Sequence, residues 1–317
     1  MSTNTTIQTA VQRYLDERRQ LGFDLIGAGM VLMRFARYAD ARHRGALTRE
    51  IQLSWACEKT SRSGPGTCVA RLQLMRPFVT YYRQFEPNSV VLDPRDFGPR
   101  PQRPTPHIYT EQEVCDLLDE AGRLSPKEGL RPATYKALFG LIAATGLRVS
   151  EALHLRDADV DLPGASLTVR QTKFNKSRCL PIHSSVVQAL GDYRSQRDQV
   201  IVNHCDMRFF VSAQGRALPS PTVHRVFSGL RERLGLKPRG QHSHVRIHDL
   251  RHTMAVRRVQ QWHQDGVTMD HGVFWLCTYL GHVKISDTYW YLTGAPELMA
   301  VVGEKFQDFV QGGADHE

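Results

Sequence analysis

Four short motifs in the second half of the chain carry cationic, imidazole and phenol side chains. The first holds Arg148 within ATGLRVSEAL, and the second holds Lys173 within the polar segment TKFNK. The third, HDLRH, contains an H-x-x-R pair, and the fourth, YLGH, is followed by two tyrosines. The side chains of interest in the last two motifs are His248, Arg251, His282 and Tyr291.

These residue types suit chemistry at a phosphodiester. When a nucleophile attacks phosphorus, negative charge grows on the non-bridging oxygens, and the planar arginine fork binds such oxygens in pairs. Donors aimed in advance at developing charge usually make the largest contribution to catalysis. A tyrosine hydroxyl can act as the nucleophile and form a covalent intermediate. The set therefore predicts transfer of a phosphodiester strand through an enzyme-bound intermediate.

Each motif alone also fits a simpler interpretation. TGLR is typical of an ordinary helix end, and Lys173 could be a solvated lysine in a turn. His248 and His252, four residues apart and close to His242 and His244, could bind zinc, or His252 could pack in the core. Because no cysteine or carboxylate stands at a convincing spacing for a third ligand, we expect no metal. The occurrence of all four motifs in this order favours the functional interpretation.

The composition indicates a basic, globular protein. Among 317 residues, 41 are Lys or Arg and 32 are Asp or Glu, which gives a net charge of +9. This balance favours a polyanionic partner, nucleic acid first, although a basic enzyme without such a partner stays compatible with it. No apolar run is long enough to span a membrane, and no signal peptide is visible. The six cysteines form no CxxC pair, so we expect free thiols and a cytoplasmic protein.

The chain divides into two predicted domains. Residues 1–95 show apolar residues at helical spacing and should form a helical domain. Residues 96–106 are rich in proline and arginine, and proline cannot continue a helix, so they should form an extended linker. Residues 107–317 should form the second domain, which contains all four motifs.

The second domain is predicted to be mainly helical with one small antiparallel sheet. Thr110 begins a capping-box pattern, and Gly146 is typical of the end of a helix. Alternating residues at 167–172 and an apolar run at 179–182 flank a polar turn and predict a β-hairpin. Residues 209–211 are candidates for a third short strand. The fold class is therefore mainly α with a small antiparallel β-sheet.

In this order the four motifs resemble those of the tyrosine recombinases, the family of phage integrases, chromosome-dimer resolvases and transposon-borne recombinases. The resemblance extends over essentially the whole chain and implies a helical, SAM-like core-binding domain before a catalytic domain. It implies that the scissile phosphate is held by Arg148, Arg251 and His282. It also implies that Tyr291 is the nucleophile, that Lys173 protonates the leaving 5′-oxygen and that His248 assists proton transfer. Lys176 is a second candidate for the lysine position.

The activity implied by this resemblance is site-specific recombination. Tyr291 would form a 3′-phosphotyrosyl link to DNA, and a 5′-hydroxyl of a partner strand would then rejoin the strand without ATP, metal or cofactor. The partners implied are duplex DNA clamped between the two domains, a tetramer of this chain, and partner recombinases or accessory DNA-bending proteins. The segment TYWYLTGAPELM resembles the transposon-encoded branch, which points to integration of a mobile element.

Two alternatives share part of this pattern. A type IB topoisomerase uses the same chemistry on one duplex, but the short chain and small N-terminal domain favour recombination. A catalytically inactive DNA-binding accessory protein is disfavoured by the intact set of six residues. The chain also departs from many family members: the stretch from Arg251 to His282 is long, and QQWHQDGVTMDHG stands before the YLGH motif as an apparent insertion. Beyond Tyr291, an apolar stripe could support assembly; it comprises Leu298, Val302, Phe306 and Phe309.

Overall fold

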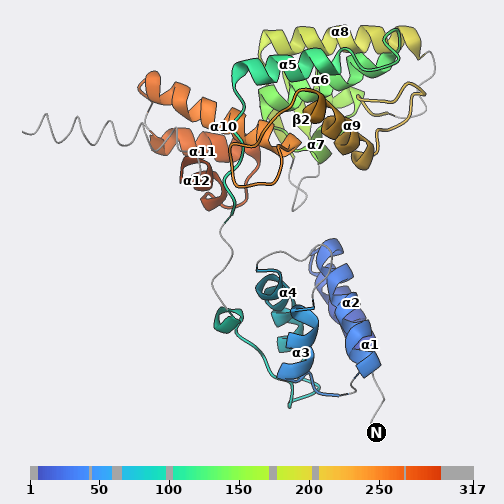
Figure 1. Ribbon diagram of the computed structural model, residues 1–317, viewed down its shortest axis with the longest axis vertical. Coiled ribbons are helices and arrows are strands. Elements are labelled where there is room, and N and C mark those ends of the chain that lie inside the picture. Colours follow the sequence, from blue (N-terminus) through green and yellow to red (C-terminus); the bar gives the residue numbers. More distant parts are fainter. Residues whose placement is uncertain are drawn as a thin grey trace, which may run out of the picture. The chain divides into compact units, whose positions relative to one another are not determined.

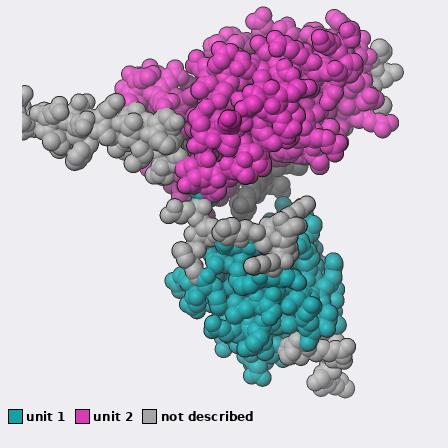
Figure 2. All heavy atoms as spheres, viewed as in Figure 1, with its two compact units in different colours: residues 1–103 teal, residues 104–317 magenta. Residues whose placement is uncertain are grey.

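The computed structural model describes residues 6–42, 45–58, 66–97, 103–170, 177–201, 207–267 and 269–293, with the side chains of all but 269, 270 and 291–293 (Figure 1). The chain forms two compact units, residues 1–103 and 104–317, which Figure 2 shows in different colours. The division between them falls inside residues 96–106, the segment predicted as a linker. Within the described residues, no helix is both long and apolar enough to cross a membrane.

The first unit is helical, as the sequence predicts. Its helices are α1 (Ile7–Gln20), α2 (Ile26–Arg42), α3 (Arg49–Ala56) and α4 (Thr67–Tyr82), followed by a short 3₁₀ helix, η1 (Pro94–Phe97). Apolar side chains one turn apart on these helices meet in one core and leave the polar residues outside. Among the most buried members of that core are Val11, Leu15, Phe35 and Phe78.

One expectation about the first unit is wrong. The sequence predicts free thiols, but Cys57 and Cys68 form a disulfide across 11 positions of sequence. Cys57 directly follows α3 and Cys68 lies in the first turn of α4, and the two helices pack against each other. This pairing is a tertiary contact, so no spacing rule for cysteines reveals it. Among the described residues, the free cysteines are Cys115, Cys179 and Cys277.

The second unit is built around one buried helix. This helix, α6 (Leu130–Thr145), is buried on nearly all sides because its residues are almost continuously apolar. Helices α5 (Glu111–Ala121) and α8 (Ser184–Val200) pack against it, as does α10 (Ile247–Gln264). At one end of the unit α10 packs with α11 (Met269–Leu280) and α12 (Ser286–Thr293) (Figure 1). Two further helices are α7 (Val149–His154) and α9 (Ser220–Arg233).

The local signals at two helix ends are confirmed. Thr110 accepts a hydrogen bond from the backbone N–H of Glu113, whose carboxylate in turn accepts one from the backbone N–H of Thr110. Gly146 ends α6 in the left-handed conformation, with φ of +65°. These caps fix where α5 begins and where the chain leaves α6 toward Arg148.

The sheet has three antiparallel strands in sequence order, β1 (Val160–Asp161), β2 (Ser166–Val169) and β3 (Arg178–Pro181). The pairing of β2 with β3 confirms the predicted hairpin. The prediction of a strand at 209–211 is wrong, because that segment makes only an isolated bridge between Val211 and Ala217. Its apolar residues are buried in the core, so burial rather than strand pairing accounts for the apolar run.

The apparent insertion before the YLGH motif is helical in large part. Helix α10 continues to Gln264, a turn follows, and α11 begins at Met269. The rings of Trp262 on α10 and Trp275 on α11 pack edge to face, with their centroids 6.1 Å apart. This segment therefore forms the end of α10 and the start of α11, and the YLGH motif lies at the end of α11.

Candidate active site

Arg251 lies at the meeting point of three of the four motifs. Its side chain is only 1% exposed. One Nη atom donates to the carbonyl of Gly146 at 2.6 Å, and the other donates to the carbonyl of Leu280 at 2.8 Å and to Nε2 of His282 at 2.9 Å. One buried guanidinium thus ties the TGLR and YLGH motifs to the helix that carries HDLRH.

The glycines of two motifs are favoured by their backbone conformation. Gly146 and Gly281 both adopt left-handed backbone conformations, with φ of +65° and +67°. A Cβ atom on Gly146 would meet Met254 Cε, and one on Gly281 would lie 2.7 Å from an Nη atom of Arg178, so these flexible side chains would have to shift. Both glycines therefore serve backbone conformation and packing around the arginines.

Arg148 is held by a carboxylate one turn further along. Its backbone N–H and one Nη atom donate to the two oxygens of Glu151, at 2.9 and 2.8 Å. Arg178 donates to the same two oxygens at 3.1 and 3.0 Å, and its Nε donates to the carbonyl of Tyr279 on α11. Burial alone would raise the pKa of Glu151, but the hydrogen bonds and charges of Arg178 and Arg148 offset it and hold that pKa below its ordinary value.

A basic groove opens beside these residues. It has a volume of about 530 Å³, and its lining includes both Arg148 and His248. The lining continues with further imidazole and guanidinium side chains, namely His224, His244, Arg231 and Arg246. None of the residues that line the groove in the described part of the chain is acidic. The groove therefore offers an anionic ligand several cationic or hydrogen-bonding neighbours.

His248 is one of the imidazoles that line this groove. It lies in the first turn of α10. The N-terminus of this helix is capped by the buried carboxylate of Asp249, which accepts a hydrogen bond from the backbone N–H of Arg246. Desolvation and the positive charges of Arg251 and Arg246 lower the pKa of His248 to about 4. The ring is consequently neutral near pH 7.

His252, which the zinc interpretation invoked, packs between two rings. Its centroid lies 4.7 Å from that of His248 and 5.1 Å from that of Trp290 on α12, both in edge-to-face geometry. In the part of the chain that the structure describes, no three His, Cys, Asp or Glu side chains are grouped so that they could hold a metal ion. In this structure His252 is a packing contact between α10 and α12.

His282 bridges α10 and α12. Its Nε2 faces Arg251, and its Nδ1 lies 2.8 Å from Oγ1 of Thr288, a fully buried residue of α12. Burial and the charges of Arg251 and Arg148 lower the pKa of His282 to about 4, so the imidazole is neutral at pH 7 in the absence of an anion.

The structure brings four of the six predicted residues to one region: Arg148, His248, Arg251 and His282. Lys173 and Lys176 lie outside the described residues, as does the apolar stripe at 298–309. The backbone of Tyr291 belongs to the last turn of α12, which packs on α10 and α11, and its side chain is outside the description. The catalytic roles of all six residues stay predictions.

Two residues at the site have no role in the sequence interpretation. Arg178 looks like one more basic residue at the start of a strand, and nothing local indicates that it pairs with Glu151. Thr288 resembles any helical threonine, and its contact with His282 depends on how α12 packs. The position of Glu151, three residues after a helix N-cap, was the one local signal that a carboxylate would bond back to Arg148.

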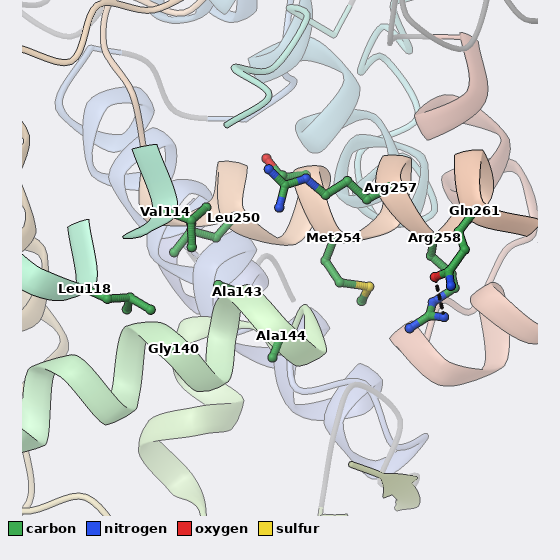
Figure 3. Close-up of a pocket in the computed structure, with 11 residues that line it drawn as sticks. Val114, Leu118, Gly140, Ala143, Ala144, Leu250, Met254, Arg257, Arg258 and Gln261 are labelled. Carbon is green, nitrogen blue, oxygen red and sulfur yellow. Dashed lines mark hydrogen bonds between the residues drawn. The ribbon is translucent and has the colours of Figure 1, made fainter. Parts of the chain in front are cut away.

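A second pocket lies on another face of α10. Its volume is about 320 Å³. Figure 3 shows residues that line it, among them Leu118 of α5, Ala144 of α6 and Met254 of α10. Arg258 and Gln261 are hydrogen-bonded to each other at its border (Figure 3). None of the six predicted residues is among those that line it in the described structure. The catalytic candidates on α10 and this mostly apolar pocket therefore lie on different sides of the helix.

Comparison with known proteins identifies a common family. The pattern of the phage integrase family matches residues 108–297. A putative integrase/recombinase of Sinorhizobium fredii, y4rB, is 37% identical over 304 residues, which cover 93% of this chain and 95% of that protein.

Two solved structures share the fold at low sequence identity. The XerH site-specific recombinase bound to a palindromic difH substrate aligns with a TM-score of 0.67 at 15% identity, covering 95% of this chain and 85% of that one. The Tn1549 transposon integrase in complex with a circular intermediate DNA aligns with a TM-score of 0.66 at 15% identity, covering 95% of this chain and 99% of that one. The match over residues 108–297 spans more than half of the chain, which thus belongs to the phage integrase family of tyrosine recombinases.

Proposed function

We propose that this chain is a site-specific recombinase that cuts and rejoins DNA through a covalent 3′-phosphotyrosyl intermediate, in the integration of a mobile element. Membership of the family indicates a DNA strand-exchange enzyme. The observation that carries the finer proposal is the set of hydrogen bonds around Arg251, because they join three separate sequence motifs beside one basic groove. The mobile-element context is supported by the likeness to an integrase/recombinase. It is also supported by the sequence TYWYLTGAPELM around Tyr291, which resembles that of transposon-encoded recombinases.

In the proposed cleavage step, the hydroxyl oxygen of Tyr291 bonds to phosphorus and the bond from phosphorus to the 5′-oxygen breaks. Lys173 donates a proton to the leaving 5′-oxygen. A tyrosine hydroxyl has an ordinary pKa of about 10, so its proton needs an acceptor near neutral pH. His248 is neutral at that pH and lies in the groove, so it can take part in this transfer. Rejoining is the reverse reaction with the 5′-hydroxyl of a partner strand.

In this proposal the negative charge of the phosphate is neutralised by hydrogen-bond donors that are held in fixed positions. Arg148 is half-buried and Arg251 is buried, and both are oriented before DNA arrives by hydrogen bonds to Glu151 and to main-chain carbonyls. Donors fixed in this way need no reorganisation as charge develops, which is where an enzyme gains most. The proposed chemistry therefore requires no metal ion.

We assign DNA binding to both units. Residues 1–95 are proposed to form the core-binding domain, and the basic groove of the second unit would receive the DNA backbone. The structurally similar Tn1549 integrase is described in complex with a circular intermediate DNA, and XerH is described as bound to a palindromic difH substrate; the first supports a DNA partner for this chain. Recombination requires two duplexes, so we propose a tetramer on DNA, with partner recombinases or DNA-bending proteins as further components.

Cleavage of a nicked suicide duplex tests this proposal. The duplexes would carry the inverted repeats found in the DNA that flanks the gene, and the reaction would contain excess EDTA. We expect an adduct of protein and DNA that survives denaturation and, with intact duplexes, recombinant joints. Relaxation of any supercoiled plasmid without joints would indicate a topoisomerase, and binding without an adduct would indicate an accessory protein. Activity that is lost in EDTA and restored by a metal ion would contradict the metal-free mechanism.

A further inference from the structure

The imidazole of His282 has a different partner on each nitrogen. Nη2 of Arg251 lies 2.9 Å from Nε2, and Oγ1 of Thr288 lies 2.8 Å from Nδ1. A guanidinium has only N–H donors and no acceptor, so the nitrogen that faces Arg251 must accept. A neutral imidazole carries its single proton on the other nitrogen. His282 is therefore the Nδ1–H tautomer, and it donates to the hydroxyl of Thr288.

Thr288 belongs to the helix that carries the proposed nucleophile. It is fully buried in α12 and precedes Tyr291 by three residues, close to one helical turn. Arg251 comes from α10, and His282 follows α11. The ring of His282 thus links three helices through two hydrogen bonds, and one of these depends on α12 being packed in place. Trp290 provides a second contact of α12, on His252 of α10.

We infer that Thr288 is a positioning residue that keeps the proton of His282 on Nδ1, so that proton exchange occurs only at Nε2, the atom directed at Arg251. This inference rests on the proposed function, because its consequence concerns the phosphate that Arg251 and His282 would hold. It goes beyond that function by making the state of a phosphate-binding side chain depend on the docking of the nucleophile helix.

The chemical consequence is a ring that can change state without turning. To donate to a non-bridging phosphate oxygen, Nε2 must gain one proton from the solvent, which converts the neutral ring to an imidazolium. The Nη2 N–H of Arg251 must at the same time exchange Nε2 for the phosphate as its acceptor, because two donors cannot face each other. The Thr288 hydroxyl accepts from Nδ1–H both before and after that step. Several charged groups face His282: Arg251, Arg148 and Arg178 disfavour the imidazolium, and Asp287 favours it. An added phosphate would favour it further.

Without the Thr288 hydroxyl, the proton of His282 would no longer be held on Nδ1. In a Thr288→Val variant, Nδ1–H would be buried without its acceptor, which is costly. The alternative tautomer would direct an N–H from Nε2 toward the N–H groups of Arg251, which is repulsive. Either tautomer of the ring would disturb Arg251 and His282, the two donors proposed to hold the phosphate. Valine fills nearly the same volume as threonine, so the change in packing is small.

Two substitutions separate this role from simple packing. Thr288→Val keeps the shape and removes the hydroxyl, whereas Thr288→Ser keeps the hydroxyl and removes a buried methyl group. If Thr288 only packs, the serine variant is the more damaged one. If the hydrogen bond to His282 matters, the valine variant is the more damaged one. Thr278→Val makes the same chemical change at an exposed position of the neighbouring helix and serves as the matched control.

The kinetic experiment measures single-turnover cleavage of the suicide duplex, together with DNA affinity and the pH profile. For Thr288→Val we expect cleavage to slow on the order of ten- to a hundredfold at unchanged DNA affinity, with a displaced pH profile. Thr288→Ser should stay within about threefold of the wild type and keep its pH profile, and Thr278→Val should match the wild type. A serine variant slower than the valine variant, or a valine variant with the wild-type rate, would overturn the inference.

A spectroscopic measurement does not depend on cleavage. Nitrogen NMR of the full chain with ¹⁵N-labelled histidine distinguishes protonated from unprotonated ring nitrogens, and His282→Gln identifies the signals of His282. In DNA-free wild type and Thr288→Ser, Nδ1 should carry the proton. In Thr288→Val the Nδ1–H population should fall. Absence of an adduct from the wild type would contradict the proposed function alone, whereas a wild-type ring protonated on Nε2 would contradict this inference.

Discussion

The two units of the molecule place their charged side chains differently. In the first unit the ion pairs of α1 lie in solvent: the side chains of Arg13 and Glu17 are 65% and 46% exposed, and those of Arg19 and Asp16 are 44% and 53% exposed. The core of that unit is formed by apolar and aromatic side chains. Its charges are therefore free to adapt to a partner, and each contributes little to stability.

The second unit instead buries charges next to the candidate site. The Glu151 side chain is 8% exposed and its partner Arg178 is 12% exposed, and the carboxylate of Asp249 is fully buried. Burying an ion is costly unless it is paired and hydrogen-bonded, as these are. The comparison indicates that the first unit contributes adaptable surface charge, whereas the second unit contributes charge at fixed positions. Substitutions should consequently have large effects in the second unit and small ones in the first.

Among the charged side chains of the two units, Arg251 is expected to give the largest effect. Arg251→Lys keeps a positive charge but cannot reproduce hydrogen bonds to two carbonyls and one imidazole from one planar group. We expect single-turnover cleavage to fall on the order of 10²-fold or more, with DNA affinity changed much less. The measurement is adduct formation at saturating DNA, with a binding titration as the control. A rate within threefold of the wild type would show that charge alone suffices.

An intermediate effect is expected from loss of the buried carboxylate. Glu151→Ala leaves Arg178 and Arg148 without their shared acceptor and should lower the free energy of unfolding of the second unit by about 3 kcal/mol. The matched change in the first unit, Asp16→Ala, removes an exposed pair and should cost at most about 1 kcal/mol. Calorimetric unfolding of both variants provides the comparison. Equal losses would contradict the distinction between the two units.

The smallest effect is expected from surface arginines of the first unit. Arg34 and Arg37 are exposed on α2. Changing both to Gln should weaken DNA binding uniformly across sequences and lower the salt dependence of log K by about 1 for each phosphate contact removed. Cleavage at saturating DNA should be unchanged. Affinity titrations at several salt concentrations measure this, and a cleavage defect at saturation would place these arginines in the chemistry instead.

Features encoded by neighbouring residues could be predicted from the sequence. The cap at Gly146, the capping box at Thr110 and the hairpin of β2 and β3 each depend on residues a few positions apart. The grouping of Arg148 with Arg251 and His282 was predicted from a family resemblance, since these positions are far apart in the chain. The structure supplies the physical reason, which is the approach of Arg251 to the carbonyl of Gly146.

Features that arise only from packing could not be predicted. The Cys57–Cys68 disulfide depends on the pairing of α3 with α4, and the bond between Arg178 and Glu151 joins a strand to a helix 27 positions away. The contact of Thr288 with His282 exists only because α12 packs on α10 and α11. Residues 209–211 misled the strand prediction because an apolar run is compatible with burial in either kind of core.

Identifying the nucleophile is the most direct test of the proposed mechanism. Tyr289 and Tyr291 both lie in α12, and at 3.6 residues per turn two positions two residues apart are about 200° apart around the helix axis. The side chain of Tyr289 is 44% exposed. Tyr291→Phe should abolish the covalent adduct while DNA binding persists, and Tyr289→Phe should still form it. Peptide mapping of the trapped wild-type adduct should find phosphotyrosine at position 291; DNA attached at 289, or at any other residue, would contradict the account.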